Sequence, residues 1–145
     1  SFLTFNFGKP KLMVTERRSG KSRRRRSAHV RGDGHIWIYC CDWRALQEGR
    51  SLASCEDNGT EIARATARLN GQKLMGVEVQ PDGGRSIFRF DLGGALETWP
   101  WDEDPTDVQW IIYQGAETFS YRADGLYHQG LSNDASDDES WLAFP

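Results

Sequence analysis

The chain has 145 residues, enough for one domain with a substantial core, and its 38% hydrophobic content with six tryptophans excludes a disordered polypeptide. No apolar run approaches the about 18 residues of a membrane-spanning helix, so the sequence predicts none. The net charge of −3 hides an asymmetry: residues 1–50 carry 12 Lys or Arg against 4 Asp or Glu, whereas residues 51–145 carry 6 against 17.

Short strands open the chain. Leu3–Phe7 and Lys11–Glu16 alternate apolar and polar side chains, which predicts two strands with one face in a core, and Ser27–Arg31 is expected to pair with the second. Between them, RRSGKSRRRR at Arg17–Arg26 has no apolar side chain. This segment is therefore predicted to be a mobile basic loop at a hairpin tip.

The middle of the chain contains the strongest strand signal and the one helix signal. His35–Trp43 is apolar on both faces up to Asp42, which predicts a central strand, and Arg44–Arg50 reads as a polar turn or a short helical piece. Thr60–Leu69 has an apolar stripe at helical spacing, a cap at Asn58 or Thr60, and a Gly stop signal after it.

Ser86–Trp101 predicts the centre of an antiparallel sheet, because two alternating runs flank the turn signal Gly93-Gly94. Further strands are predicted at 73–80, 109–113, 118–122 and 126–128, followed by an acidic segment at 132–140. The pattern predicts an α+β fold in a single domain, 1–145: a mostly antiparallel sheet, sandwich or curled barrel, of about eight or nine strands with one helix near 60–69.

The basic loop is the first candidate binding site. Its cations would contact the phosphates of a nucleic acid or another anionic surface, with an affinity that falls steeply with salt. The alternative is a solvated tip, or one that meets the acidic segments of the same chain or of a second copy, which suggests a homodimer. The candidate residues are Arg17, Arg18, Lys21, Arg23, Arg24, Arg25 and Arg26.

Trp99 and Trp101 are the second candidate site. Next to a polar loop they predict an aromatic platform for a sugar or a peptide, although tryptophans on alternating strand positions usually fill a core.

The remaining chemistry is sparse. Three cysteines, two of them adjacent, favour small buried thiols in a reducing, cytoplasmic compartment over a disulfide framework. No spacing of ligands predicts a metal site, and no cofactor is expected. A small hydrolase-type enzyme would need His35, Asp42 or His128 to converge in a pocket, and no nucleophile motif accompanies them.

FNFGKPKL near the start, HIWIYCCDW in the middle and FRFDLGGALETWPW later resemble a family of small uncharacterised bacterial proteins. The resemblance spans most of the chain and implies a stand-alone bacterial cytoplasmic domain, without assigning any residue a role.

The sequence as a whole favours a non-enzymatic binding or interaction domain, of the regulatory or immunity-protein kind. Its aromatic-rich scaffold would present charged loops to a macromolecule. A protein partner or self-association is expected first and no membrane partner is expected. Nucleic-acid binding through the basic loop is the alternative, and the hydrolase is the third hypothesis.

Overall fold

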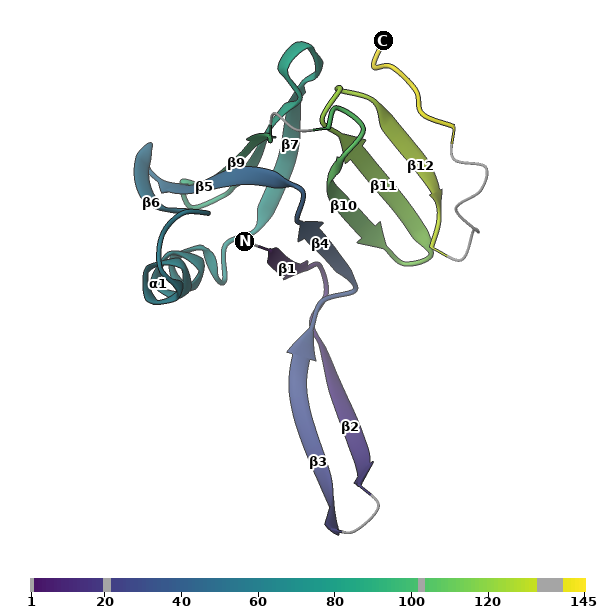
Figure 1. Cartoon of the computed structure of the whole chain (residues 1–145). Coiled ribbons are helices and arrows are strands. Elements are labelled where there is room, and N and C mark those ends of the chain that lie inside the picture. The colour runs from purple at the N-terminus through teal and green to yellow at the C-terminus, as the bar shows by residue number, and fades with distance from the viewer. Residues whose placement is uncertain (1, 20–21, 102–103, 133–139) are drawn as a thin grey trace.

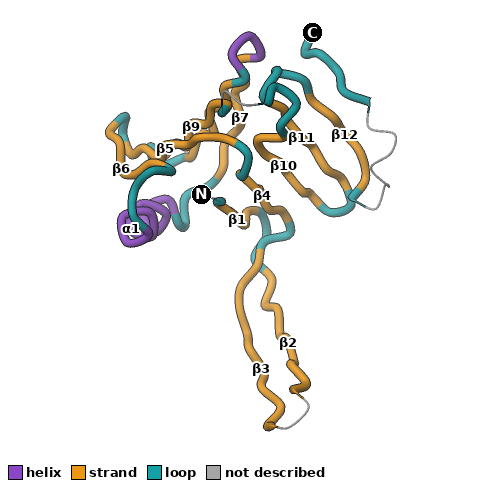
Figure 2. The backbone as a smooth tube through the Cα atoms, in the orientation of Figure 1, coloured by secondary structure: helices purple, strands orange, loops and turns teal. Residues whose placement is uncertain are grey.

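The computed structural model describes residues 2–19, 22–101, 104–132 and 140–145, and does not describe the side chains of residues 17–25. Over these residues the chain forms twelve strands, one α-helix and one short 3-10 turn, η1 (Pro81–Gly83). Figures 1 and 2 show two five-stranded sheets side by side, with a two-stranded ribbon projecting from one end.

Every strand pairs with its neighbours in antiparallel fashion. Sheet 1 has the order β1 (Leu3–Phe7), β4 (Gly34–Ile38), β10 (Val108–Gln114), β11 (Glu117–Arg122), β12 (Tyr127–Leu131). Sheet 2 has the order β6 (Arg50–Ser54), β5 (Cys41–Gln47), β9 (Gly94–Pro100), β8 (Arg85–Phe90), β7 (Leu74–Gln80). The ribbon consists of β2 (Lys11–Ser19) and β3 (Ser22–Arg31).

One hydrophobic core joins the two sheets. Ile36, Ile38 and Trp110 contribute from sheet 1, and Trp43 and Phe88 contribute from sheet 2. The β-rich α+β class is therefore confirmed. The strand number is higher than expected, and the sheets are two open layers and a ribbon instead of a closed barrel.

The strand predicted at His35–Trp43 is wrong as a single element. The chain bends at Tyr39 and Cys40, where the Tyr39 amide donates to the carbonyl of Gln109 (3.0 Å) and the Cys41 amide donates to the carbonyl of Tyr39 (3.0 Å). The first half becomes β4 in sheet 1 and the second becomes β5 in sheet 2. Even-numbered side chains point inward before the bend and odd-numbered ones after it.

Two predicted connections are also strand. Residues 44–50 are not a turn or helical piece, because β5 continues to Gln47 and turns at Glu48-Gly49 into β6. The stretch 17–26, expected as a loop, is mostly part of the ladder, since β2 extends to Ser19 and β3 starts at Ser22.

The predicted helix is confirmed as α1 (Gly59–Leu69). Asn58 is the N-cap: its side-chain oxygen accepts hydrogen bonds from the amides of Thr60 (3.0 Å) and Glu61 (3.1 Å), which satisfies two of the free amides at the helix start. Ala65 and Leu69 are buried where the helix packs on sheet 2.

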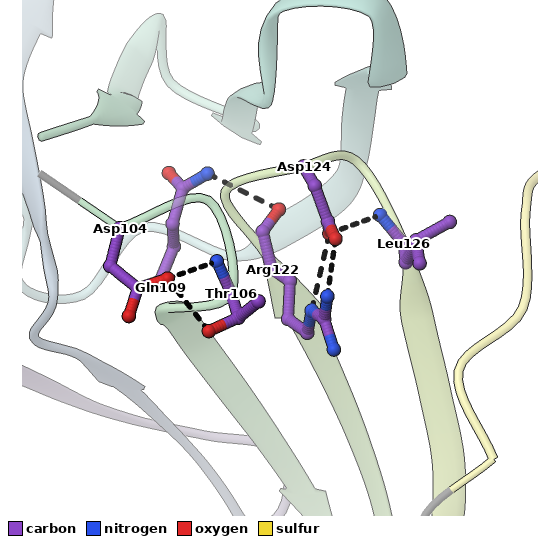
Figure 3. A network of polar contacts seen from close by, with 6 residues as sticks. All are labelled: Asp104, Thr106, Gln109, Arg122, Asp124 and Leu126. Atoms are coloured by element: carbon purple, nitrogen blue, oxygen red, sulfur yellow. Dashed lines mark hydrogen bonds and ion pairs between the residues drawn. The ribbon is translucent and has the colours of Figure 1, made fainter. Parts of the chain in front are cut away.

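Figure 3 shows polar contacts that hold the turn between β11 and β12 and join its start to Gln109 of β10. Asp124 accepts hydrogen bonds from the Arg122 guanidinium and from the Leu126 amide. Gln109, which is buried, donates its Nε2 to the carbonyl of Gly84 (2.6 Å) and to that of Arg122 (3.4 Å). Gly84 follows η1, in the connection between β7 and β8 of sheet 2, so Gln109 connects the ends of both sheets.

The C-terminal aromatic residues dock on sheet 1. Leu142 pairs with Tyr127 through two backbone hydrogen bonds, and the ring of Phe144 lies 4.6 Å from that of Tyr127. Most of the acidic segment at 132–140 lies outside the described residues.

The ribbon is inserted into a hairpin. β1 and β4 pair in continuous register from Leu3 with Ile38 to Phe7 with Gly34, so their joining ends already lie side by side. The chain leaves the β1–β4 hairpin after Pro10 and returns to it at Gly32, and we call the residues between them, 11–31, the arm. Every side chain described in the arm is exposed.

We therefore expect the arm to be dispensable for folding. Removing residues 11–31 and joining Pro10 to Gly32 leaves a five-residue loop, Gly8-Lys9-Pro10-Gly32-Asp33, between β1 and β4. The free energy of unfolding should change by less than about 1 kcal/mol, because none of the side chains described in the arm is buried. Urea denaturation measures it, and a loss above about 2 kcal/mol would show that the arm supports the body.

Candidate functional site

The arm presents an apolar stripe along one face. Leu12 is opposite Val30 and Val14 is opposite Ala28, so these four side chains share a face of the ribbon. Leu12, Val14 and Val30 are between 58% and 68% exposed. A two-stranded ribbon is marginally stable in water, and here its apolar side chains lack the cover of a second layer in the described structure.

The arm is also strongly basic. Its sequence contains nine Lys or Arg residues and one acidic residue, Glu16, giving a net charge of +8, so the rest of the chain carries −11. Arg26 is exposed and forms an ion pair with Glu16, which lies directly opposite in the ladder. The side chains of the other predicted binding residues, Arg17, Arg18, Lys21, Arg23, Arg24 and Arg25, lie outside the described residues.

Trp99 near the end of β9 and Trp101 just after it each have a polar or charged neighbour. The indole Nε1 of Trp101, which is 36% exposed, donates to Oδ1 of Asp42 (2.9 Å). The guanidinium of Arg44 lies 6.0 Å from the ring centre of Trp99. Neither residue lines either of the two clefts described below.

A different set of aromatic side chains lies on the outer face of sheet 1. His35 and Trp37 on β4 point away from the core, because Ile36 and Ile38 point into it. The neighbouring strand β10 places Tyr113 opposite His35 and Ile111 opposite Trp37. We call this surface, made of Thr4, Asn6, His35, Trp37, Ile111 and Tyr113, the aromatic face.

The rings of the aromatic face are ordered by mutual contact. His35 and Tyr113 stack with centroids 4.3 Å apart and planes 10° apart, and Trp37 meets Tyr113 edge-on at 5.4 Å. Trp37 remains 47% exposed. Tryptophan with this exposure beside two fixed rings provides a rigid stacking surface.

An apolar groove of about 430 Å³ continues the aromatic face toward the start of β1. Its walls include Phe2, Thr4, Trp37, Tyr39 and Ile111. The Phe2 and Tyr39 rings stack at 6.5 Å. A groove of this size is within the range that holds a small organic ligand or one unit of a polymer.

The opposite end of the aromatic face meets the arm. Nη2 of Arg31, the last residue of β3, lies 3.4 Å from Nδ1 of His35. Burial and the charge of Arg31 lower the pKa of His35, so the imidazole is uncharged at neutral pH, and Nδ1 accepts from the guanidinium. Cationic and aromatic groups are thus contiguous on one side of the molecule.

The three candidate catalytic residues do not converge. His35 stacks on Tyr113 in sheet 1, whereas Asp42 in sheet 2 accepts from Trp101 and from Sγ of Cys55 (3.2 Å). His128 on β12 lies 3.1 Å, through Nδ1, from the carbonyl of Ser140. None of the three lines either cleft described here.

The three cysteines are present as thiols and not in disulfides. Burial raises the pKa of Cys41, which is fully buried. Burial also raises the pKa values of Cys40 and Cys55. All three are therefore protonated at neutral pH and poor nucleophiles. Across the part of the chain that the structure describes, no cluster of three His, Cys, Asp or Glu side chains is arranged to hold a metal ion.

A larger cleft, of about 990 Å³, separates β1 from the end of α1 and the start of β7. Phe5, Phe7, Leu69, Leu74 and Phe90 contribute apolar walls. Lys73 is the single charged residue along it among the described residues, so the cleft contains no acid-base pair.

No family model matches the chain, and the comparisons with curated proteins and with solved structures find no match. Within the described residues, no helix is long and apolar enough to cross a membrane.

Sequence reasoning missed the aromatic face. Simple alternation along residues 35–43 places Trp37 on the same side as Cys41 and Trp43, both of which are fully buried. Trp37 differs from Cys41 and Trp43 because of the bend at Tyr39 and Cys40. The inward-pointing residues are even-numbered before this bend and odd-numbered after it. Hydrophobic alternation alone does not reveal a change of sheet that lacks Gly or Pro.

Proposed function

We propose that this protein is a non-enzymatic binding module that engages an anionic macromolecule through the arm. The observation that carries the proposal is the arm itself: an exposed ribbon, inserted into an otherwise complete hairpin, with a net charge of +8 on a chain whose remainder is −11. The described side chains of the arm are all exposed and so do not serve the core, and its exposed apolar stripe is typical of a surface that a partner covers.

The charge of the arm limits the kinds of partner that it can bind. Two arms meeting face to face would bring +8 against +8, which opposes association through the arms alone. Nucleic acid offers a dense row of phosphates that the arginines can contact. A second copy is the other candidate, because the acidic remainder of one molecule complements the arm of another and would give a salt-sensitive homodimer.

A salt titration with charge-matched variants tests the proposal. Changing Arg23, Arg24, Arg25 and Arg26 to Ser lowers the net charge by four units within the arm. The matched control changes four exposed arginines of the body to Ser and lowers the net charge equally: Arg50, Arg64, Arg68 and Arg85.

We expect the wild type to bind fluorescein-labelled 20-nucleotide DNA or RNA at low salt, and the arm variant to bind at least about 100-fold more weakly, because several phosphate contacts are lost. The body variant should stay within a few-fold of wild type. Fluorescence anisotropy from low to moderate salt measures both. Equal losses in the two variants would overturn a role for the arm, as would an unaffected arm variant.

Sedimentation velocity on the same proteins tests the second candidate partner, another copy of the chain. A dimer that forms at low salt, dissociates at high salt and is lost in the arm variant, without nucleic-acid binding, would assign the arm to self-association. A monomer that binds no nucleic acid would refute both partners.

A further inference from the structure

We infer that the aromatic face is a stacking platform for the bases of a single-stranded nucleic acid, whose phosphates continue onto the root of the arm. This inference rests on the proposed function, because it names the anionic partner and the surface that reads its bases. The residues of the aromatic face belong to β1, β4 and β10 and therefore lie outside the arm.

The geometry of the face suits unpaired bases. His35 and Trp37 are two positions apart on β4, so their side chains are spaced by roughly 6 to 7 Å along the strand. Trp37 and Tyr39 continue this row into the groove, where Phe2 forms the far wall. Bases splayed from a single strand stack on such rings, and exposed aromatic side chains on a sheet surface are a common way of holding them.

Polar groups flank the rings. Thr4 is opposite Trp37 and Asn6 is opposite His35, and both side chains are exposed on the edge strand β1. Each offers a donor and an acceptor beside the ring that a base would cover. The groove and its border therefore combine apolar stacking with hydrogen-bonding groups at the position of a base edge.

Charge selects a nucleic acid over an uncharged sugar or peptide. Arg31 contacts His35 at one end of the aromatic face, and Lys9 and Lys11 are exposed where the arm leaves β1. A polymer with a base on Trp37 has its next phosphates directed along this row of cations. A neutral ligand would use the rings but would gain nothing from the adjoining arm.

A duplex fits the face less well than a single strand. In a duplex the faces of the bases are stacked on one another, so the flat ring of Trp37 has no free base to cover. The arm alone can contact a duplex through phosphates. Preference for single strands is therefore the property that the aromatic face adds.

The test compares Trp37→Ala, Trp37→Phe and, as a control, Met75→Ala, an exposed apolar side chain of β7 in sheet 2. The probes are a labelled 20-nucleotide oligo-dT, an oligo-U of equal length, the duplex of equal length, and an abasic oligodeoxynucleotide with the same number of phosphates. Anisotropy is read at one low salt concentration, after circular dichroism has confirmed folding of each variant.

We expect Trp37→Ala to weaken binding of oligo-dT or oligo-U by about 5- to 150-fold, since stacking one base is worth about 1–3 kcal/mol. Trp37→Phe should recover most of the affinity, and Met75→Ala should bind as wild type does. The abasic probe should bind weakly to wild type and be insensitive to Trp37→Ala.

Failure of this inference is distinct from failure of the proposed function. If Trp37→Ala binds single strands as wild type does, or if the abasic probe binds equally well, base stacking is refuted while the arm variants still report on phosphate binding. Duplex binding that Trp37→Ala weakens as much as it weakens single-strand binding would also refute base stacking. If no probe binds, the aromatic face has no nucleic-acid role, and sedimentation decides whether the arm serves self-association.

Discussion

Trp110→Ala is expected to remove about 4 kcal/mol from the free energy of unfolding, a large part of the total for a domain of this size. Trp110 is 1% exposed, and its ring packs against Phe88 (5.3 Å), Phe119 (5.8 Å) and Tyr121 (5.1 Å). Its removal leaves a cavity at the point where the two sheets meet, because Phe88 belongs to sheet 2 and the other rings to sheet 1.

A second cost comes from the indole nitrogen. Nε1 of Trp110 donates to the hydroxyl of Ser86 (2.9 Å), which is also buried, so the truncation leaves Ser86 without that donor in the core. Trp110→Phe separates the two costs, since it retains a ring and loses the hydrogen bond, and should be about 1 to 2 kcal/mol less stable than wild type.

Trp37→Ala is the matched control for this prediction. The residue type and the truncation are identical, but Trp37 is on the outer face of sheet 1, so the loss should be below about 1 kcal/mol. Urea denaturation followed by circular dichroism gives all three values. Equal losses at positions 110 and 37 would contradict the assignment of one to the core and the other to the surface.

Gly125→Ala is expected to destabilise the protein by about 2 to 4 kcal/mol, because it combines backbone strain with a steric clash. Gly125 has φ +81°, which side chains rarely adopt, and a Cβ atom there would lie 2.3 Å from the carbonyl oxygen of Pro81. Gly84 mirrors this arrangement: its own Cβ would lie 2.2 Å from the carbonyl oxygen of Ala123. The turn after β11 and the turn η1 therefore touch backbone to backbone.

Gly115→Ala isolates the strain from the clash. Gly115 also has a positive φ, +63°, but no atom lies within 4 Å of a Cβ placed there. It should therefore cost only about 1 kcal/mol. Thermal or urea denaturation of the two variants measures the difference, and an equal cost at both positions would show that the two turns do not need their close approach.

Local signals predicted several elements well. The bounds of β1 agree with the alternation of Leu3, Phe5 and Phe7, and α1 begins one residue before the predicted start because Asn58 acts as the cap. Gly93-Gly94 does mark the turn between β8 and β9. In each case the information lies within a few residues, where turn and capping preferences act.

Features that depend on distant partners were not predictable in the same way. β4 and β5 look like one strand because both are apolar, and only their pairing with β10 and β9 respectively divides them. The number of strands was underestimated for the same reason. Alternation with Val77 and Val79 would place Met75 on the inward side, but Met75 is exposed because β7 has a bulge between Leu74 and Gly76 that shifts the register against β8.

The candidate site was predicted in part. The basic segment was identified from composition alone, yet its position at the end of an exposed ribbon required the structure. The aromatic face was not found, since the exposure of Trp37 follows from the change of sheet after Ile38. Six tryptophans in one sequence give no indication of which two or three are exposed.

The order of strands along the chain also governs how the protein folds during synthesis. Sheet 2 is complete once Pro100 has been made, whereas Ile38 must wait for Trp110, 72 positions later, before β4 gains its second neighbour. Until then the nascent chain exposes the apolar surfaces that the finished halves bury against each other. We expect the joining of β10 to β4 to be the slow, aggregation-prone step, because closing so long a segment is entropically costly.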